Sequence, residues 1–352
     1  MSPPRIRLTR PDDWHVHFRD GAALAAVAPA TAEVFGRAIV MPNVKPPVAT
    51  TGMAAQYRAR ILAALPVGSR FAPLMTLYLT DETSSEEISR AKASGFVHAV
   101  KYYPAGATTN SQSGVTSLAR TYPALAAMER ADLVLAVHGE VTDPDVDVFD
   151  RERVFVDREL AAIVRDFPAL RVVLEHATTR EGVEFVASAS AKVAATITPQ
   201  HLLYSRNALF AGGLRPHLYC LPLLKRETHR QSLVAAATSG SPKFFLGTDS
   251  APHAKSVKED ACGCAGCYSA PVALPSYAEV FEDAGALDKL EGFASVHGAA
   301  FYGLPRNSGT VELVRESWTV PTSLPFGDET IVPLRAGQAL RWRLLAPAGK
   351  AA

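Results

Sequence analysis

The sequence has few cysteines, no long apolar run and almost no net charge, and each of these features excludes a class of protein. Three of its four cysteines fall between residues 262 and 267, which is poor spacing for a disulfide framework. No run approaches the roughly 18 apolar residues of a membrane span, and no apolar segment follows the basic residues near the start. The 36 Lys and Arg residues nearly balance the 35 Asp and Glu residues, so the sequence has no excess of positive charge for binding nucleic acid. We therefore expect a cytoplasmic protein that binds neither nucleic acid nor membrane.

Short β-branched or aliphatic runs recur along the chain, and most end in a polar residue followed by a helical pattern. Near-continuous apolar runs are typical of strands buried on both faces, as in a parallel sheet. Eight strands alternating with helices over about 250 residues predict an α/β fold, the (β/α)8 TIM barrel. A doubly wound open sheet is the alternative, but no glycine-rich phosphate motif follows any of the strands. The predicted strands are 13–17, 38–43, 72–80, 97–101, 133–138, 171–176, 193–198 and 243–249.

Between these runs the pattern predicts helices within 53–61, 116–130, 152–167 and 226–238. After Leu304 the pattern changes to short β-like segments at 310–314, 330–334 and 340–344. About fifty residues are too few for an independent core. We therefore predict a barrel of residues 1–304 with a C-terminal extension, residues 305–352, that packs on it.

Polar residues stand where the predicted strands end, and in a barrel these ends converge on one mouth. His15 and His17 lie two residues apart, so both rings face the same side of their strand. Such histidines with an aspartate suit zinc or another first-row ion, although a single strand histidine is more often a hydrogen-bonded core residue. Asp249 can bind metal and accept a proton from water, or it can cap the following segment. The residues at strand ends are His15, His17, Asn43, Lys101, His138, His176 and Asp249.

Lys101 ends a buried strand, where an ammonium group is costly to desolvate. It is therefore paired, neutral or modified, unless it is an ordinary surface lysine at a strand end. A neutral amine can add CO2 to give a carbamate that bridges two metal ions. The polar stretch 104–114 that follows suits a lid over the mouth or a simple connector. Arg19 and Asn43 suit a substrate carboxylate, or a surface ion pair and a turn.

Several motifs together make the chain resemble the amidohydrolase superfamily and, within it, the short bacterial-type (class II) dihydroorotases. The resemblance covers nearly all of residues 1–304 and is carried by the whole combination of motifs. They include Trp14-His-Val-His-Phe-Arg-Asp-Gly21, Lys101-Tyr-Tyr-Pro104, Leu174-Glu-His176, Gly247-Thr-Asp-Ser-Ala-Pro-His253 and Cys262-Gly-Cys-Ala-Gly-Cys267.

The resemblance implies two zinc ions in each subunit. His15, His17 and Asp249 would bind one ion, His138 and His176 the other, and Lys101 as N6-carboxylysine would bridge both. A bridging hydroxide would attack the ring amide of L-dihydroorotate, with Asp249 as the proton shuttle. The same steps reversed would cyclise N-carbamoyl-L-aspartate in pyrimidine (UMP) biosynthesis.

The resemblance also implies the substrate contacts and a homodimer. The substrate contacts would be Arg19, Asn43, His138 and His253, the backbone of Leu221 and Ala265, and Thr108 and Thr109 on a mobile loop. Gly106 departs from the family, in which we expect a larger polar residue in that loop.

Three alternative interpretations stay open at this point. Another cyclic-amide hydrolase, such as a hydantoinase or allantoinase, would have a longer chain with a strand-rich segment before the His-x-His motif. A metal-free scaffold barrel would have lost ligands, whereas every expected ligand type is present here. The cysteines at 262–267 could form a zinc knuckle, although a glycine-rich loop with reduced thiols fits their spacing better.

Overall fold

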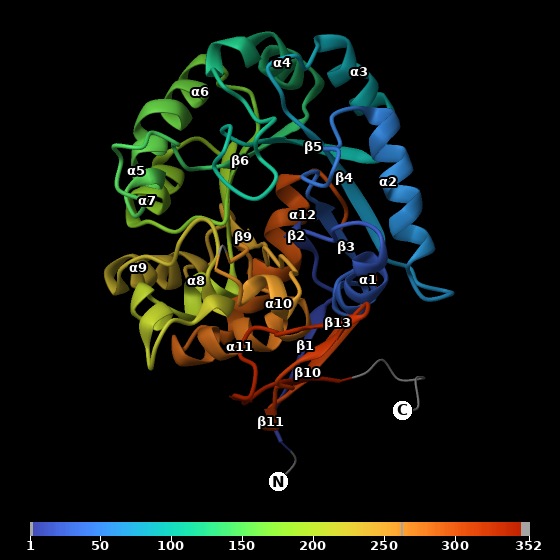
Figure 1. Cartoon of the computed structure of the whole chain (residues 1–352), viewed down its shortest axis with the longest axis vertical. Coiled ribbons are helices and arrows are strands. Elements are labelled where there is room, and N and C mark those ends of the chain that lie inside the picture. The colour runs from blue at the N-terminus through green and yellow to red at the C-terminus, as the bar shows by residue number, and fades with distance from the viewer. Residues whose placement is uncertain (1–2, 262, 346–352) are drawn as a thin grey trace.

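The computed structural model describes residues 3–261 and 263–345, and its centre is a parallel sheet of eight strands in sequence order, β2 to β9. Helices surround the strands (Figure 1). The strands are β2 (Asp13–Val16), β3 (Arg37–Val40), β4 (Ala72–Tyr78), β5 (Val97–Tyr102), β6 (Val134–His138), β7 (Val172–Glu175), β8 (Val193–Ile197) and β9 (Phe244–Leu246). All eight predicted strands overlap these, so the predicted TIM barrel is confirmed.

The barrel closes where the first strand, β2, meets the last, β9. The backbone N–H of Asp249 donates to the carbonyl of His15 at 2.9 Å, and that of His17 donates to the carbonyl of Ser250 at 3.0 Å. Val16 and Ser250 form a parallel bridge at the same place. Residues from the two ends of the barrel sequence are thereby held side by side.

The helices cover the outside of the barrel, and side-chain caps start several of them. Thr50, Ser84 and Thr179 each accept a hydrogen bond from a backbone N–H in the first turn of α2, α3 and α7. The predicted helix at 152–167 is interrupted by a π-helical turn at Val156–Leu160. The helices are α1 (Ala22–Val34), α2 (Thr51–Ala63), α3 (Ser85–Ala93), α4 (Leu118–Ala131), α5 (Arg151–Phe155), α6 (Ala161–Asp166), α7 (Arg180–Ser188), α8 (Pro199–Leu203), α9 (Glu227–Thr238), α10 (Lys255–Lys258), α11 (Ala273–Asp283) and α12 (His297–Phe301).

Alternation along the strands divides the barrel interior into layers. One apolar cluster fills the lower interior, by which we mean the part nearer the N-terminal ends of the strands. The alternate strand residues point outward and pack under the helices. Trp14 closes this cluster from below by stacking on Tyr302, directly after α12, with ring centroids 4.5 Å apart. The strand residues of the cluster include Ile39, Leu74, Ala99, Ala136, Val173, Ala194 and Phe245. Two residues further along four of these strands stand Lys101, His138, Glu175 and Thr196, all buried.

A small antiparallel sheet lies beside the barrel, at the lower edge of Figure 1. It joins β1 (Arg5–Thr9), β10 (Thr310–Val314) and β15 (Arg343–Leu344), with Arg5 opposite Val314 and Thr9 opposite Thr310. The sequence predicted the strand at 310–314 but missed β1. The predicted strands at 330–334 and 340–344 are shorter than expected, because only β13 (Glu329–Ile331), β14 (Ala339–Leu340) and β15 form there. The remaining strands are β11 (Trp318–Thr319) and β12 (Leu324–Phe326).

The extension after residue 304 shares its hydrophobic core with the barrel. Trp342 and Leu313 are buried in the same cluster as the outward-facing strand residues. The sheet of this extension also includes β1, from the N-terminal end of the chain. The predicted division at residue 304 therefore stays a prediction. In the part of the chain that the structure describes, no helix has the length and apolarity needed to cross a membrane.

Gly298 in α12 has no room for a side chain. A Cβ atom there would lie 2.0 Å from the indole nitrogen of Trp14. We expect Gly298→Ala to lower the free energy of unfolding by about 1–3 kcal/mol, as other overpacked cores do, in urea unfolding. Gly52→Ala in α2 is the matched control, since its Cβ meets nothing within 4 Å and alanine favours helix. Equal stability of Gly298→Ala and the unsubstituted chain would contradict this packing.

Candidate metal centre and active site

Three ligand atoms converge at the seam of the barrel. His15 Nε2 and His17 Nε2 lie 3.2 Å apart, and Asp249 Oδ1 lies 3.2 Å from the first and 3.1 Å from the second. Ligands bound to a tetrahedral zinc ion at about 2.0–2.1 Å are separated by about 3.3 Å, so the triangle has the size of one face of such a site. These residues therefore fit a metal ion without rearrangement.

The irregular register of β2 brings both histidines inward. The pairing of β2 with β3 shifts between Asp13 and Val16, so Trp14 faces the lower interior while His15 still reaches the ligand triangle. Bulges of this kind commonly redirect side chains beside active sites. On the far side of His17, Nδ1 lies 2.9 Å from Asn43 Oδ1, which can only accept. The proton is thereby assigned to Nδ1, and Nε2 is left free to bind metal.

A second group of candidate ligands lies beside the first. The ring of His176 is 5.0 Å from that of His15 and 4.9 Å from that of His138. His176 Nδ1 is buried and has no hydrogen-bond partner, which is the state of a ligand that lacks its ion. His138 Nε2 is held at 2.9 Å by Glu140 Oε2. The ligand atoms of His176, His15 and Glu175 form a second group close enough together to hold a metal ion, with the ring of His138 beside it.

Lys101 is fully buried on β5 and forms an ion pair with Glu175 at the end of β7. The other carboxylate oxygen, Glu175 Oε1, lies 3.0 Å from His15 Nδ1, although the ring N–H is not aligned for a hydrogen bond. Burial lowers the pKa of Lys101, against the opposing effect of Glu175. The lysine at this strand end is therefore paired, one of the states that its sequence position predicts.

The carboxylates of the centre favour a positive charge on His15, whereas His17 and His176 stay neutral. Burial alone would keep His15 neutral, but Glu175 and Asp249 outweigh it and raise the pKa of His15 to about 9. Burial lowers the pKa of His17 to about 4, and burial together with Lys101 holds the pKa of His176 well below its usual value. Two carboxylates and several neutral imidazoles, all shielded from water, are a donor set for divalent first-row metals.

The backbone is strained at three of the predicted site residues. Arg19, His176 and Asp249 have φ of 58°, 43° and 44°, in the left-handed region that non-glycine residues rarely adopt. Such conformations cost about 1–3 kcal/mol each and are concentrated at functional sites. The turn at His176 follows Glu175 directly, so two consecutive side chains reach the interior of the barrel.

Arg19, His253 and Ala265 come together on one side of the mouth. Arg19 Nε donates to the carbonyl of Pro252 at 3.0 Å, and its Nη2 lies 2.8 Å from His253 Nε2. The same ring nitrogen lies 3.0 Å from the carbonyl of Ala265. Burial, and then Arg19, lower the pKa of His253 to about 2, so the ring is neutral. Its Nε2 accepts from the guanidinium in one tautomer and donates to the Ala265 carbonyl in the other. The result is a fixed arginine beside a neutral histidine.

The stretch 104–114, predicted to be a lid or a connector, is anchored to Asn43 at the mouth. Asn43 Nδ2 donates to the carbonyl of Thr109 at 3.0 Å, and Asn110 Nδ2 donates to the carbonyl of Asn43 at 3.0 Å. The N–H of Thr108 is held by Ser111 Oγ at 2.8 Å. Gly106 has φ of 82°, so the turn favours the glycine that departs from the family pattern.

Leu221 lies in a segment that packs against the glycine-rich loop. The N–H of Gly266 donates to the carbonyl of Tyr219 at 2.9 Å. Buried Lys258 donates to the carbonyls of Tyr219, Cys264 and Gly266 at 2.7–2.9 Å. Cys262 lies outside the described residues, and the groups of metal-ligand atoms found in 3–261 and 263–345 contain no cysteine. The loop in this region is held together by a lysine and the backbone.

Sequence reasoning missed two buried carboxylates of the centre, Glu175 and Glu140. Glu175 stands two residues after inward-facing Val173, so strand alternation alone could have predicted that it faces the interior. The signal for Glu140 is its two-residue spacing from His138. Asp13 was missed as well. It accepts from Thr248 Oγ1 at 2.6 Å and from the N–H of Thr248 at 2.8 Å across the seam.

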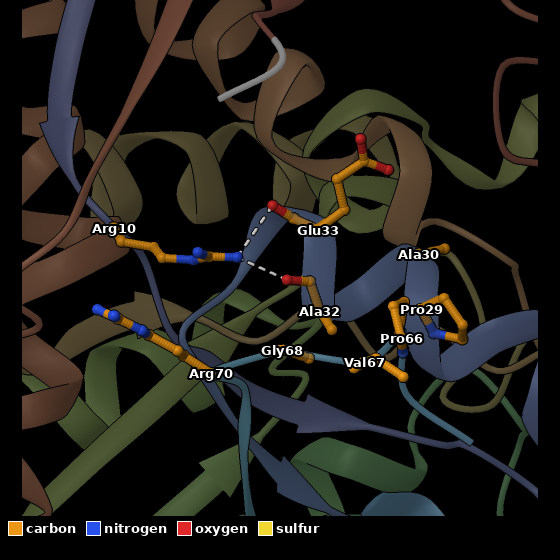
Figure 2. Close-up of a pocket in the computed structure, with 10 residues that line it drawn as sticks. Arg10, Pro29, Ala30, Ala32, Glu33, Pro66, Val67, Gly68 and Arg70 are labelled. Carbon is orange, nitrogen blue, oxygen red and sulfur yellow. Dashed lines mark hydrogen bonds between the residues drawn. The ribbon is translucent and has the colours of Figure 1, made fainter. Parts of the chain in front are cut away.

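A groove of about 540 Å³ lies at the other end of the barrel, between α1 and the loop before β4 (Figure 2). Arg10 crosses it and donates to the carbonyls of Ala32 and Glu33 at the end of α1. None of the predicted site residues lines this groove. Of its two arginines, Arg10 and Arg70, Arg10 is held by the end of α1.

Comparison with known proteins agrees with the fold and the site. The model of the amidohydrolase family matches residues 12–328, and the chain therefore belongs to the amidohydrolase family. The dihydroorotase of Cupriavidus necator is 67% identical over 339 residues, which are 96% of this chain and 98% of that protein. The crystal structure of the dihydroorotase of Campylobacter jejuni is 34% identical, with a TM-score of 0.90 and 98% of each chain covered.

The dihydroorotase of Saccharomyces cerevisiae, solved in complex with 5-fluoroorotic acid, is also 34% identical, with a TM-score of 0.89 over 97% of this chain and 98% of that one. Within its family, the chain is thus a cyclic amidohydrolase of the dihydroorotase group, and the resemblance seen in the sequence is confirmed.

The ligand triangle predicts a metal-dependent gain in stability. We expect zinc added to metal-free protein to raise the midpoint of thermal unfolding, because the ion binds the native state; at a thousand times Kd the gain is about 4 kcal/mol. His17→Ala should remove most of this shift. His229→Ala, on α9, should keep it, since the His229 ring contacts the start of α7, at the N–H of Arg180 and the carboxylate of Glu181. An equal shift in both variants would mean that zinc binds elsewhere.

Proposed function

We propose that the chain hydrolyses the ring amide of L-dihydroorotate to N-carbamoyl-L-aspartate and, in the biosynthetic direction, closes the ring with loss of water. The observation that carries this proposal is the triangle of His15, His17 and Asp249, formed next to a fixed arginine at one barrel mouth. The related yeast enzyme, whose structure holds 5-fluoroorotic acid, supports a pyrimidine ring with a carboxylate as the ligand.

We propose that two zinc ions are the metals. His15, His17 and Asp249 would hold one ion, His138 and His176 the other, and carboxylated Lys101 would bridge them. When bound, the zinc ions would polarise the ring amide carbonyl and lower the pKa of water at the centre.

The carbamate forms when the neutral amine of Lys101 attacks CO2. One C–N bond forms, one proton leaves to solvent, and a single N–H remains on Nζ. The lowered pKa of Lys101, caused by burial, favours the neutral amine that this reaction requires.

Asp249 moves the proton in this mechanism. Its carboxylate accepts a proton from the attacking water and delivers it to the ring nitrogen as the C–N bond of the ring amide breaks. In the biosynthetic direction it removes the proton from the carbamoyl nitrogen. The strained backbone and the two histidines hold this carboxylate in one place, which the transfer requires.

Arg19 and His253 hold the substrate carboxylate, with Asn43 beside them. The guanidinium is already fixed by the Pro252 carbonyl, so little side-chain entropy is lost when substrate binds. The ring edge would meet His138 and the backbone of Leu221 and Ala265. Thr108 and Thr109 would close over the substrate and exclude water.

We further propose a cytoplasmic homodimer. The free thiols of Cys220, Cys264 and Cys267 support a reducing compartment. The dimer rests on the resemblance to the family alone, and light scattering of the purified protein tests it.

The deciding experiment is the rate of L-dihydroorotate hydrolysis by zinc-loaded protein in bicarbonate buffer, with hydantoin and allantoin in parallel. We expect turnover of dihydroorotate alone, and its loss in folded Asp249→Asn. Turnover of hydantoin or allantoin in preference would replace the proposed substrate. Absence of turnover and of bound metal would favour a scaffold barrel instead.

Removal of the arginine fork tests how the substrate carboxylate is recognised. Arg19→Met should raise KM about 10- to 150-fold, because a hydrogen bond to a charged group contributes about 1.5–3 kcal/mol, with a smaller change in kcat. Arg60→Met is the control, since that exposed side chain pairs with Asp20. Steady-state kinetics with an unchanged KM in Arg19→Met would move carboxylate recognition to other residues.

A further inference from the structure

Glu175 is a buried carboxylate to which the proposed mechanism gives no role. Its side chain has no solvent exposure, and its two oxygens face different partners. Oε2 accepts from Lys101 Nζ, and Oε1 lies 3.0 Å from His15 Nδ1. Both partners are candidate ligands from other strands, β5 and β2. One carboxylate on β7 therefore contacts both candidate ligands at once.

We infer that Glu175 is a positioning residue that fixes Lys101 for carbamate formation and holds His15 with its proton on Nδ1. The inference rests on the carbamate in the proposed function. At His15 it concerns the ring nitrogen that faces away from the triangle, since His17 and Asp249 lie at His15 Nε2. At Lys101 it concerns Nζ itself.

The tautomer of His15 depends on the acceptor at Nδ1. A carboxylate can only accept, so a neutral ring next to Glu175 carries its proton on Nδ1 and keeps the lone pair of Nε2 for the ion. The 3.0 Å contact is not aligned as a hydrogen bond, and a small rotation of the carboxylate would align it. Carboxylates behind metal-binding histidines act in this way in many metal sites.

The same carboxylate suits both forms of Lys101. The amine donates to Oε2, and after CO2 addition the single N–H that remains on Nζ can donate to the same oxygen. Glu175 therefore directs the new carboxylate of the carbamate away from itself. Because this site is completely buried, an unpaired lysine there would be costly, and Glu175 offsets that cost while the lysine is unmodified.

Glutamine cannot replace both functions, although it has the same shape. It offers one acceptor oxygen and one NH2 donor, whereas Lys101 and His15 each present an N–H. If the oxygen faces Lys101, the NH2 faces His15 Nδ1 and favours the tautomer with the proton on Nε2, where the metal should bind. Glu175→Gln should therefore weaken zinc binding even where the fold is intact.

The test measures two quantities that do not depend on turnover. Protein is loaded with zinc in 13C-bicarbonate, and the carbamate signal is recorded by 13C NMR, with zinc affinity measured by competition with a chelator. We expect Glu175→Gln to lose most of the carbamate signal and to bind zinc about 10- to 100-fold more weakly.

The matched control is Glu152→Gln. Glu152 is equally buried and accepts five hydrogen bonds of 2.5–3.0 Å near the candidate site, from the backbone N–H groups and hydroxyls of Thr178 and Thr179. It contacts none of the candidate ligands, so this variant should lose stability but keep the carbamate signal and the zinc affinity. If both variants lose them to the same extent, Glu175 has only a structural role and the inference is wrong.

Two further outcomes separate the inference from the proposal on which it rests. Absence of a carbamate signal in the unsubstituted protein would overturn the carbamate itself. A full signal and unchanged zinc affinity in Glu175→Gln would overturn only the role of Glu175. If Glu175→Gln does not fold, Glu175→Asp, which draws the oxygens back by one methylene, is compared with Glu152→Asp, and a full carbamate signal would again overturn the role.

Discussion

The closure of the barrel between β2 and β9 is the constraint on which the rest of the structure depends. Backbone hydrogen bonds from Asp249 and His17 form this seam, so the residues that close the fold are also candidate metal ligands. Asp13 strengthens the seam by accepting from Thr248, just after β9, and it also accepts from the N–H of His15 at 3.2 Å. Asp13 has no solvent exposure at this seam, and burial raises its pKa to about 7. A rigid seam explains how atoms more than two hundred residues apart form a triangle with sides of 3.1–3.2 Å.

The barrel interior carries two layers of opposite character, and each makes the other possible. The lower layer is apolar and is closed by Trp14, so it supplies the stability of an ordinary barrel core. The upper layer places Lys101 and Glu175 where charge is costly, and only mutual pairing makes it tolerable. A buried ion pair of this kind adds little to the stability of the fold. Its presence is explained instead by the metal ion that the centre could bind. The strain at His176 and Asp249 has the same explanation, since the packed core beneath it holds the backbone in place.

Strand alternation explains both what the sequence could predict and what it could not. The apolar runs predicted all eight strands, and the polar residue at each run's end predicted the histidines, Lys101 and Asp249. The same two-residue period, carried on from Val173, would have predicted that Glu175 faces inward. Strand β1 could not be found in this way, because its pairing with β10 joins segments about 300 residues apart. The hydrogen bonds of Asn43 to His17 and to the carbonyl of Thr109 could not be predicted either. They depend on how loops fold back and not on any local pattern.

The position of Glu175 shows why a TIM barrel suits a metal centre. Consecutive parallel strands place equivalent residues at one level, so an acceptor on β7 reaches a lysine on β5 and, across the interior, a histidine on β2. Ligands from so many strands need partners behind them, because each ring has two nitrogens and only one can face the ion. Asn43 fills this place behind His17, Glu140 behind His138, and Glu175 behind His15. Each partner is identified by its short distance to the ring nitrogen that faces away from the centre. A cluster of histidines without such partners would not be preorganised to bind a metal ion.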